Sequence, residues 1–266
     1  MLSEDQRRAF HEDGYLRLPA AVPSAATERM RERLWRMLEH RGACRDDPST
    51  WTPAAATRLQ GMRKGDVAPH DSPTVVDALD DLIGPGAWRA QRHWGQVLVT
   101  FPNREVWDVP HRPWHIDHGY DFPRDAIWGV NVFLFVDDVQ PEGGGTLVLH
   151  GSPRIMRAFV DGLRPATRTQ KQLRHAFDAS DPYLKALSDP SDTVDRVARF
   201  VDRDTDVHGV PTRVVPLSGR AGDVVVCHPW TVHNVAPNTC DRPRMMRASR
   251  AFHRDLLAQV RRPESA

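Results

Sequence analysis

The sequence predicts a mainly β protein with flanking helices. Short apolar or alternating runs bounded by turn residues recur along the second part of the chain, at 96–101, 127–136, 145–149, 213–217, 222–228 and 244–252. These runs do not alternate regularly with helices, so they indicate a barrel or sandwich and not a parallel βαβ sheet. Helical patterns occupy roughly the first 90 residues and one long segment between residues 153 and 212.

The first helix is expected at 3–13. Ser3 and Gln6 have the spacing of a capping box, and Gly14 can end the helix because glycine adopts the left-handed backbone conformation easily. A short strand is expected directly afterwards, at 15–18.

A second helix is expected to start with Ser24 as its N-cap and to end near Gly42. Residues 44–70 are rich in Pro, Arg and Asp and indicate a loop. A third helix is predicted at 73–83, with Gly84 after its last turn. One face of the second helix is apolar and predicts core packing, through Met30, Leu34, Met37 and Leu38.

The segment 154–209 is predicted to be a helical insertion in the β core, with helices at 155–163, 169–177, 183–187 and 193–201. Long insertions of this kind are often functional. One hypothesis is that it covers the open end of the barrel and shapes a substrate pocket, and the alternative is surface decoration. The chain is expected to form one domain, with N-terminal helices at about 1–90 and core at about 91–153 and 210–255.

Composition excludes several classes of function. The formal net charge is +1, so no basic groove for nucleic acid is expected, and no apolar stretch approaches the length of a membrane span. Three cysteines without a Cys-x-x-Cys motif, together with a charged N-terminus, favour a reduced, cytoplasmic location.

His115, Asp117 and His233 are the candidate metal ligands. Residues two apart on an extended strand point to the same face, so His115 and Asp117 can address one point in space. Two imidazoles and one carboxylate form the facial triad that holds non-haem Fe(II). His118 would point off the shared face, and His228, the main rival to His233, has the sequence context of a strand end packed in the core.

The order of the surrounding motifs resembles the phytanoyl-CoA dioxygenase family of Fe(II)/2-oxoglutarate oxygenases over roughly residues 5–250. The matching stretches are Trp114-His-Ile-Asp117, the apolar run 128–136, Pro141-Glu-Gly-Gly-Gly-Thr146, 222–229, 233–238 and Asp241-Arg-Pro-Arg244. The resemblance implies a double-stranded β-helix (jelly-roll, cupin-like) core, Fe(II) and 2-oxoglutarate as cofactors, and O2 as co-substrate. It implies hydroxylation of an unactivated C–H of a small molecule, with release of succinate and CO2.

Arg244 lies 11 positions after His233, where the resemblance places the arginine that binds 2-oxoglutarate. Arg247 is an alternative, because an Arg-x-Ser pattern serves this purpose in other 2-oxoglutarate oxygenases. An odd separation puts the two arginines on opposite faces of a regular strand, so only one can serve. Gln96 and Thr146 are further candidate cofactor contacts.

Other functions remain open at this stage. The same triad could bind Zn2+ in a hydrolase, or the protein could bind 2-oxoglutarate without catalysis. Within the oxygenase class, desaturation, epimerisation or cyclisation are alternatives to hydroxylation. Halogenating relatives replace the carboxylate ligand with a small residue, so Asp117 argues against halogenation. A natural-product intermediate is the expected substrate, and the sequence does not give the oligomeric state.

Overall fold

A computed structural model describes residues 1–57, 59, 72–91, 95–103, 106–120, 126–163, 169–192 and 194–256. In this part of the chain, the fold is a mixed α and β arrangement built on antiparallel sheets, and helices hold more residues than strands. The predicted β core is present. The expectation that the chain as a whole is mainly β is corrected, because the N-terminal region and the insertion add helices on the outside.

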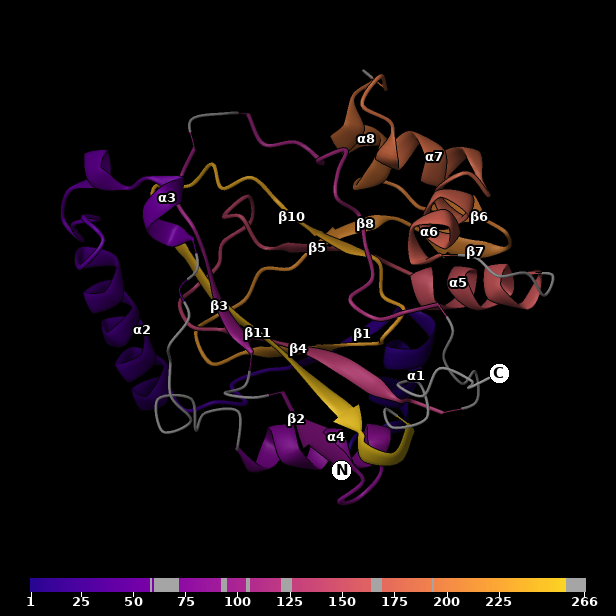
Figure 1. Ribbon diagram of the computed structural model, residues 1–266, viewed down its shortest axis with the longest axis horizontal. Coiled ribbons are helices and arrows are strands. Elements are labelled where there is room, and N and C mark those ends of the chain that lie inside the picture. Colours follow the sequence, from indigo (N-terminus) through magenta and orange to yellow (C-terminus); the bar gives the residue numbers. More distant parts are fainter. Residues whose placement is uncertain are drawn as a thin grey trace.

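The larger sheet has β11 at its centre (Figure 1). This long strand pairs with β4 along one edge, and with β3 and β2 along the other. β9 and β1 continue the sheet beyond β4. The sequence did not predict β2. The strands are β1 (Tyr15–Leu18), β2 (Trp88–Ala90), β3 (Gln96–Thr100), β4 (Gly129–Phe135), β9 (Val224–Cys227) and β11 (Arg244–His253).

The smaller sheet has the order β10-β5-β8, from β10 (His233–Val235), β5 (Thr146–Leu149) and β8 (Val214–Pro216). A separate hairpin joins β6 (Thr205–Val207) to β7 (Val210–Thr212). The last helix of the insertion was expected to end at 201, and the strand β6 that follows it inside the insertion was not predicted. His208 and Gly209 both have positive φ, 53° and 79°, and reverse the chain into the hairpin.

The N-terminal helices are α1 (Glu4–Glu12), α2 (Ser24–Glu39), α3 (Pro53–Ala56) and α4 (Pro73–Ile83), with a 3-10 turn η1 (Pro48–Thr50). The capping box of Ser3 and Gln6 is confirmed. The predicted cap of α2 was wrong, since Pro23 takes the N-cap position and Ser24 is the first helical residue. The expected loop at 44–70 contains η1 and α3, and 58 and 60–71 lie outside the described residues.

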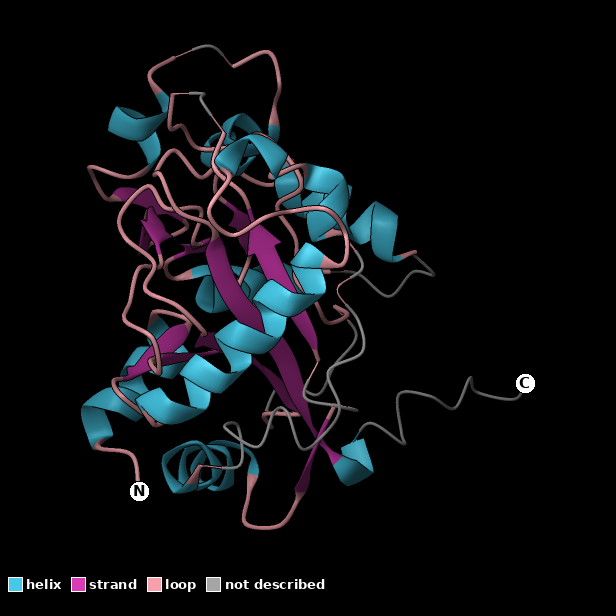
Figure 2. Cartoon of the chain, turned by 90° about the vertical axis from the view of Figure 1, so that its left-hand side faces the viewer, coloured by secondary structure: helices cyan, strands magenta, loops and turns pink. Residues whose placement is uncertain are grey.

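Helices cover the outer faces of both sheets. α2 lies along one side of the larger sheet (Figures 1 and 2), where the predicted apolar face of the helix joins a core with Val130, Val132 and Leu134 of β4. A second core lies between the two sheets and includes Phe133, Phe135 and Val148. Every helix in the described part of the chain is too short or too polar to cross a membrane.

The insertion folds as α5 (Ser152–Asp161), α6 (Gln170–Asp178), α7 (Pro182–Ser188) and α8 (Arg196–Phe200). The four predicted helical stretches are therefore present in the described residues. These helices gather on one side of the molecule (Figure 1), and a third core joins their apolar faces to Leu147, Leu149 and Val214 of the smaller sheet.

Candidate functional site

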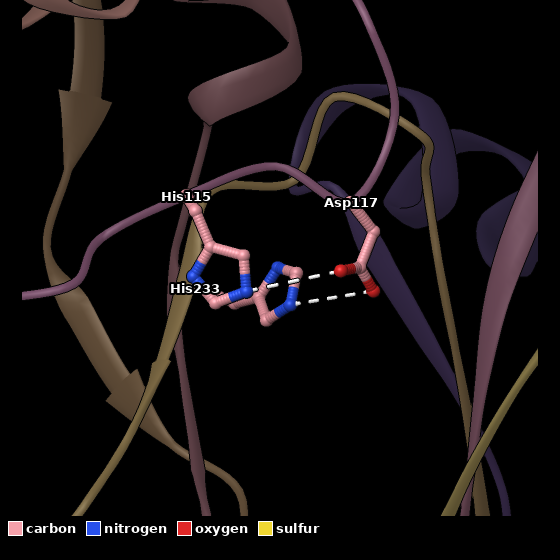
Figure 3. A group of neighbouring side chains, drawn as sticks. All are labelled: His115, Asp117 and His233. Carbon is pink, nitrogen blue, oxygen red and sulfur yellow. Dashed lines mark ion pairs between the residues drawn. The ribbon is translucent and has the colours of Figure 1, made fainter. Parts of the chain in front are cut away.

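The three predicted metal ligands meet at the edge of the smaller sheet. His115 forms an isolated antiparallel bridge with His233, in which the backbone nitrogen of each residue donates to the carbonyl of the other, at 3.1 and 2.9 Å. Asp117 follows in a bend and not in a strand. The expectation of one regular strand through His115 and Asp117 was therefore wrong, although the bend still directs the carboxylate toward the two imidazoles (Figure 3).

The distances in this cluster suit one shared ion. The Nε2 atom of His115 lies 3.8 Å from Asp117 Oδ1, and the Nε2 atom of His233 lies 3.7 Å from Asp117 Oδ2 (Figure 3). One ligand atom from each residue lies within 4.8 Å of the others, and these are the residues that form such a cluster among those described. A metal ion between the three atoms requires only small side-chain movements, because metal–ligand bonds in proteins are about 2.0–2.2 Å long.

Backbone carbonyls favour the same tautomer in both imidazoles. The Nδ1 atom of His115 lies 3.0 Å from the carbonyl oxygen of Pro113, and Nδ1 of His233 lies 3.0 Å from that of Thr231. A carbonyl can only accept, so in the neutral form of each imidazole Nδ1 carries the hydrogen and Nε2 presents a lone pair to the cluster. Burial, with the neighbouring His115, lowers the pKa of His233 and favours its neutral form.

The competing histidines do not join this cluster. His118 is buried against Trp128, and its Nε2 atom lies 3.1 Å from the Asn131 side-chain oxygen. His228 accepts a hydrogen bond from the backbone nitrogen of Trp230 through Nδ1, at 3.1 Å. Burial lowers the pKa of both histidines to about 3, so both are neutral core residues at neutral pH.

A cavity of about 410 Å³ adjoins the triad. Three of the four predicted cofactor contacts line it, namely Gln96, Thr146 and Arg244, whereas Arg247 does not. Its walls come from β3, β10 and β11 and from the segment around α3. The polar and charged residues among its lining are His115, Asp117, His233, Gln96, Thr100, Thr146, Asn234, Arg244, Ser249 and Arg250.

Arg244 is a buried cation without a carboxylate partner among the described residues. It is 4% exposed, and its Nε and Nη2 atoms donate to the Thr100 hydroxyl at 3.2 and 2.5 Å. Burial lowers its pKa to about 10, so the guanidinium stays protonated at neutral pH. A buried charge without a counter-charge is costly, and an anion in the cavity would offset that cost.

Arg247 lies on the other face of β11. Met246 belongs to the core between the sheets, whereas Met245 and Ala251 belong to the core under the N-terminal helices. The side chains of Met245, Arg247 and Ala251 therefore share the face of β11 that packs under the helices. Arg247 is fully buried there, outside the cavity.

Sequence reasoning did not assign a role in the site to Thr100, Asn234 or Arg250. Thr100 holds Arg244, and Asn234 has a buried Nδ2 atom without a hydrogen-bond partner in the described part of the chain. Arg250 lies beside the triad, with Nη2 3.6 Å from Asp117 Oδ1 and Nη1 3.5 Å from the Asp117 carbonyl oxygen. Arg250 lies six positions after Arg244 on the predicted strand, and residues an even number apart share a face, so this spacing could have revealed it.

The insertion does not line the cavity with any of its described residues, and the hypothesis that it shapes the pocket stays a prediction. Ala56 and Leu59, from the segment around α3, provide part of the wall instead. The insertion supports the segment that carries His115. Arg196 of α8 donates to the Val109 carbonyl at 2.7 Å, and Arg112 donates to the Ser188 carbonyl at 3.2 Å.

Comparison with known proteins agrees with this architecture. L-Proline trans-4-hydroxylase of Streptomyces griseoviridis is 24% identical over 247 residues, which cover 90% of this chain and 82% of that protein. The epimerase SnoN, solved in complex with Fe3+, alpha ketoglutarate and nogalamycin RO, matches with a TM-score of 0.53 and 20% identity, covering 94% of this chain and 82% of SnoN.

HygX from Streptomyces hygroscopicus, solved with nickel and 2-oxoglutarate bound, matches with a TM-score of 0.54 and 16% identity, covering 96% of this chain and 88% of HygX. At these identities the two structures show a shared fold. The family model of phytanoyl-CoA dioxygenase (PhyH) matches residues 10–246, which is most of the chain. The chain therefore belongs to the phytanoyl-CoA dioxygenase (PhyH) family.

Proposed function

We propose that this protein is an Fe(II)- and 2-oxoglutarate-dependent dioxygenase that hydroxylates an unactivated C–H of a small molecule and releases succinate and CO2. One observation carries the proposal. A single cavity joins a His-Asp-His cluster to Arg244, a buried cation without a carboxylate partner among the described residues. A keto acid that also has a distal carboxylate can satisfy both features at once.

Each residue has a defined task in this proposal. The Nε2 atoms of His115 and His233 and the carboxylate of Asp117 hold Fe(II) on one face and leave the remaining positions open. Bound iron and 2-oxoglutarate supply, with O2, the oxidising chemistry. Arg244, held in place by Thr100, binds the distal carboxylate of 2-oxoglutarate.

Gln96 and Thr146 line the same cavity and are proposed as further polar contacts to 2-oxoglutarate. Arg247 stays the less favoured anchor because it lies on the opposite face of β11. The two antiparallel sheets enclose a common core, and this arrangement supports the proposed double-stranded β-helix (jelly-roll). The division of residues 1–266 into one domain stays a prediction.

The names of the relatives support the proposed substrate class and leave the outcome of the reaction open. One relative is named as a hydroxylase of L-proline, while SnoN is named as an epimerase and SnoK as a carbocyclase from nogalamycin biosynthesis. A small molecule, with a natural-product intermediate as the expected type, therefore remains the proposal. In a Zn2+ hydrolase the buried Arg244 would have no function, so this alternative is less well supported than an oxygenase.

An anaerobic titration of the metal-free protein with Fe(II) and 2-oxoglutarate tests the proposal. We expect a visible metal-to-ligand charge-transfer band in the wild-type protein. The band should be absent in His115→Ala, because that variant loses one of the two imidazole ligands.

His150→Ala is the matched control, because His150 lies near Asp13 and outside the cluster. This variant should retain the band. Absence of the band in the wild-type protein, combined with tight Zn2+ binding, would contradict the oxygenase function and favour a hydrolase.

A further inference from the structure

The cavity has a second arginine whose function is not explained by the metal or by 2-oxoglutarate. Arg244 and Arg250 lie on β11 six positions apart, so both side chains face the cavity, and their Cα atoms are roughly 20 Å apart at about 3.4 Å per residue. Arg244 lies at the end next to Thr100, whereas Arg250 lies at the end next to Asp117. The cavity therefore has a cation at each end.

The charges in the cavity do not cancel. Asp117, Arg244 and Arg250 are the charged residues among its described lining, and an imidazole that binds a metal through Nε2 is neutral, so the two triad histidines add no charge to the loaded site. The protein groups therefore carry one net positive charge. Fe(II) and the 2-oxoglutarate dianion cancel each other, so the loaded cavity keeps that single positive charge beside the metal.

The contact of Arg250 with Asp117 leaves most of the guanidinium available. Both of its distances to Asp117, 3.6 and 3.5 Å, are long for charge-assisted hydrogen bonds, and its side chain is 35% exposed. A divalent ion on the Asp117 carboxylate weakens the attraction further, since the carboxylate then shares its charge with the metal.

Hydrogen-bond donors are also in excess around Arg250. Asn131 lies directly opposite on β4, 1% exposed, and its Nδ2 atom has no hydrogen-bond partner among the described residues. The side-chain oxygen of Asn131 is already close to His118 Nε2. Asn131 itself does not line the cavity, but beside it the donors of Arg250 have only the long contacts to Asp117, so a bound anion would supply acceptors that this region needs.

We propose that Arg250 binds a carboxylate of the prime substrate, so that the enzyme acts on small molecules with one anionic group. The cavity volume of about 410 Å³ must also hold 2-oxoglutarate, which limits the substrate to a small molecule. Apolar wall residues, including Ala56, Leu59 and Val235, surround the remainder of the substrate. This inference rests on the proposed oxygenase function.

The test uses the anaerobic protein loaded with Fe(II) and 2-oxoglutarate, and propionate and propionamide as probes of equal shape and different charge. Binding is measured by calorimetry and by the change in the charge-transfer band. We expect propionate to bind the wild-type protein at least about tenfold more tightly than propionamide, with this preference lost in Arg250→Met and partly kept in Arg250→Lys. Arg154→Met is the matched control, since Arg154 is exposed on α5 and lines a separate cavity.

The outcomes separate the two proposals. If no band forms in the wild-type protein, the oxygenase function fails. If the band forms but propionate and propionamide bind equally, or if Arg250→Met keeps the preference for propionate, only the proposal for Arg250 is overturned. Loss of the band in both Arg250→Met and Arg250→Lys would show that Arg250 positions Asp117, and would also overturn it.

Discussion

The two halves of the candidate site are built in different ways. Arg244, Thr100 and Gln96 lie on β11 and β3, and the paired register of these strands determines where each side chain points. His115 and Asp117 lie instead on an irregular segment with a single bridge to His233. Regular pairing lets the first half be placed by counting residues, whereas the second half depends on contacts made elsewhere in the molecule.

The irregular half depends on the insertion for support. Trp114 is buried in the core under α5–α8 and donates through Nε1 to the Pro110 carbonyl at 2.8 Å. Arg196 holds the Val109 carbonyl. A helical region whose described residues do not line the cavity therefore still supports the segment that carries a candidate metal ligand, and we infer this supporting role for the insertion.

The largest effect is expected in the regular half. Arg244→Met should weaken 2-oxoglutarate binding by about 100-fold or more, because it removes the cation that is proposed to pair with the distal carboxylate of 2-oxoglutarate. Fe(II) binding should stay intact. Arg247→Met changes the opposite face of the same strand and should alter 2-oxoglutarate affinity less than about threefold. Titration of the charge-transfer band measures both, and the reverse result would assign the anchor to Arg247.

The next effect concerns the irregular half. Arg196 is 2% exposed and donates to the carbonyls of Val109, Ala186 and Leu187. Arg196→Met leaves these carbonyls without their donor, and we expect the free energy of unfolding to fall by about 3 kcal/mol. Fe(II) affinity should fall by about tenfold, because a residue that orients the ligand segment is lost. Urea unfolding and metal titration measure these changes.

Arg199→Met is the control for Arg196. Arg199 pairs with Asp192 at 2.6 Å and is 32% exposed, so its loss should cost less than about 1 kcal/mol. Equal effects of the two substitutions would mean that the Val109 contact does not support the metal site.

The smallest effect is a dependence of the free energy of unfolding on pH, caused by a histidine next to the larger sheet. His228 follows β9, packs against Phe10 and has a pKa lowered by burial from 6.5 to about 3. Below pH 6.5 the unfolded chain binds a proton at His228 that the folded chain does not, so stability must fall as the pH falls. This residue should reduce the free energy of unfolding by about 2 kcal/mol between pH 7.5 and 5.

His228→Gln removes the titrating group and keeps a hydrogen-bond acceptor near the Trp230 backbone nitrogen. Urea unfolding of the metal-free protein at both pH values should show a weaker pH dependence in the variant. The remaining dependence should come from other buried histidines such as His118. If the free energy of unfolding of the variant changed with pH as much as that of the wild-type protein, His228 would not be buried in its neutral form.

Short-range sequence signals predicted much of the fold. The capping box at Ser3, the start of α4 after Ser72 and its end at Gly84 follow from short-range chemistry and match the structure. Errors arose where pairing partners were distant. β10 has three residues and β2 has three, and neither shows a pattern strong enough to predict without its neighbour in the sheet.

By itself, the sequence determined the residue types of the site and their order. It named His115, Asp117 and His233 as ligands, and the alternation of β11 separated Arg244 from Arg247, because side chains of a strand alternate between faces. Only the tertiary structure decided that Asp117 lies in a bend, that Arg250 lies beside it, and that the insertion supports the ligand segment. These features depend on contacts between residues up to 133 positions apart, which no local pattern encodes.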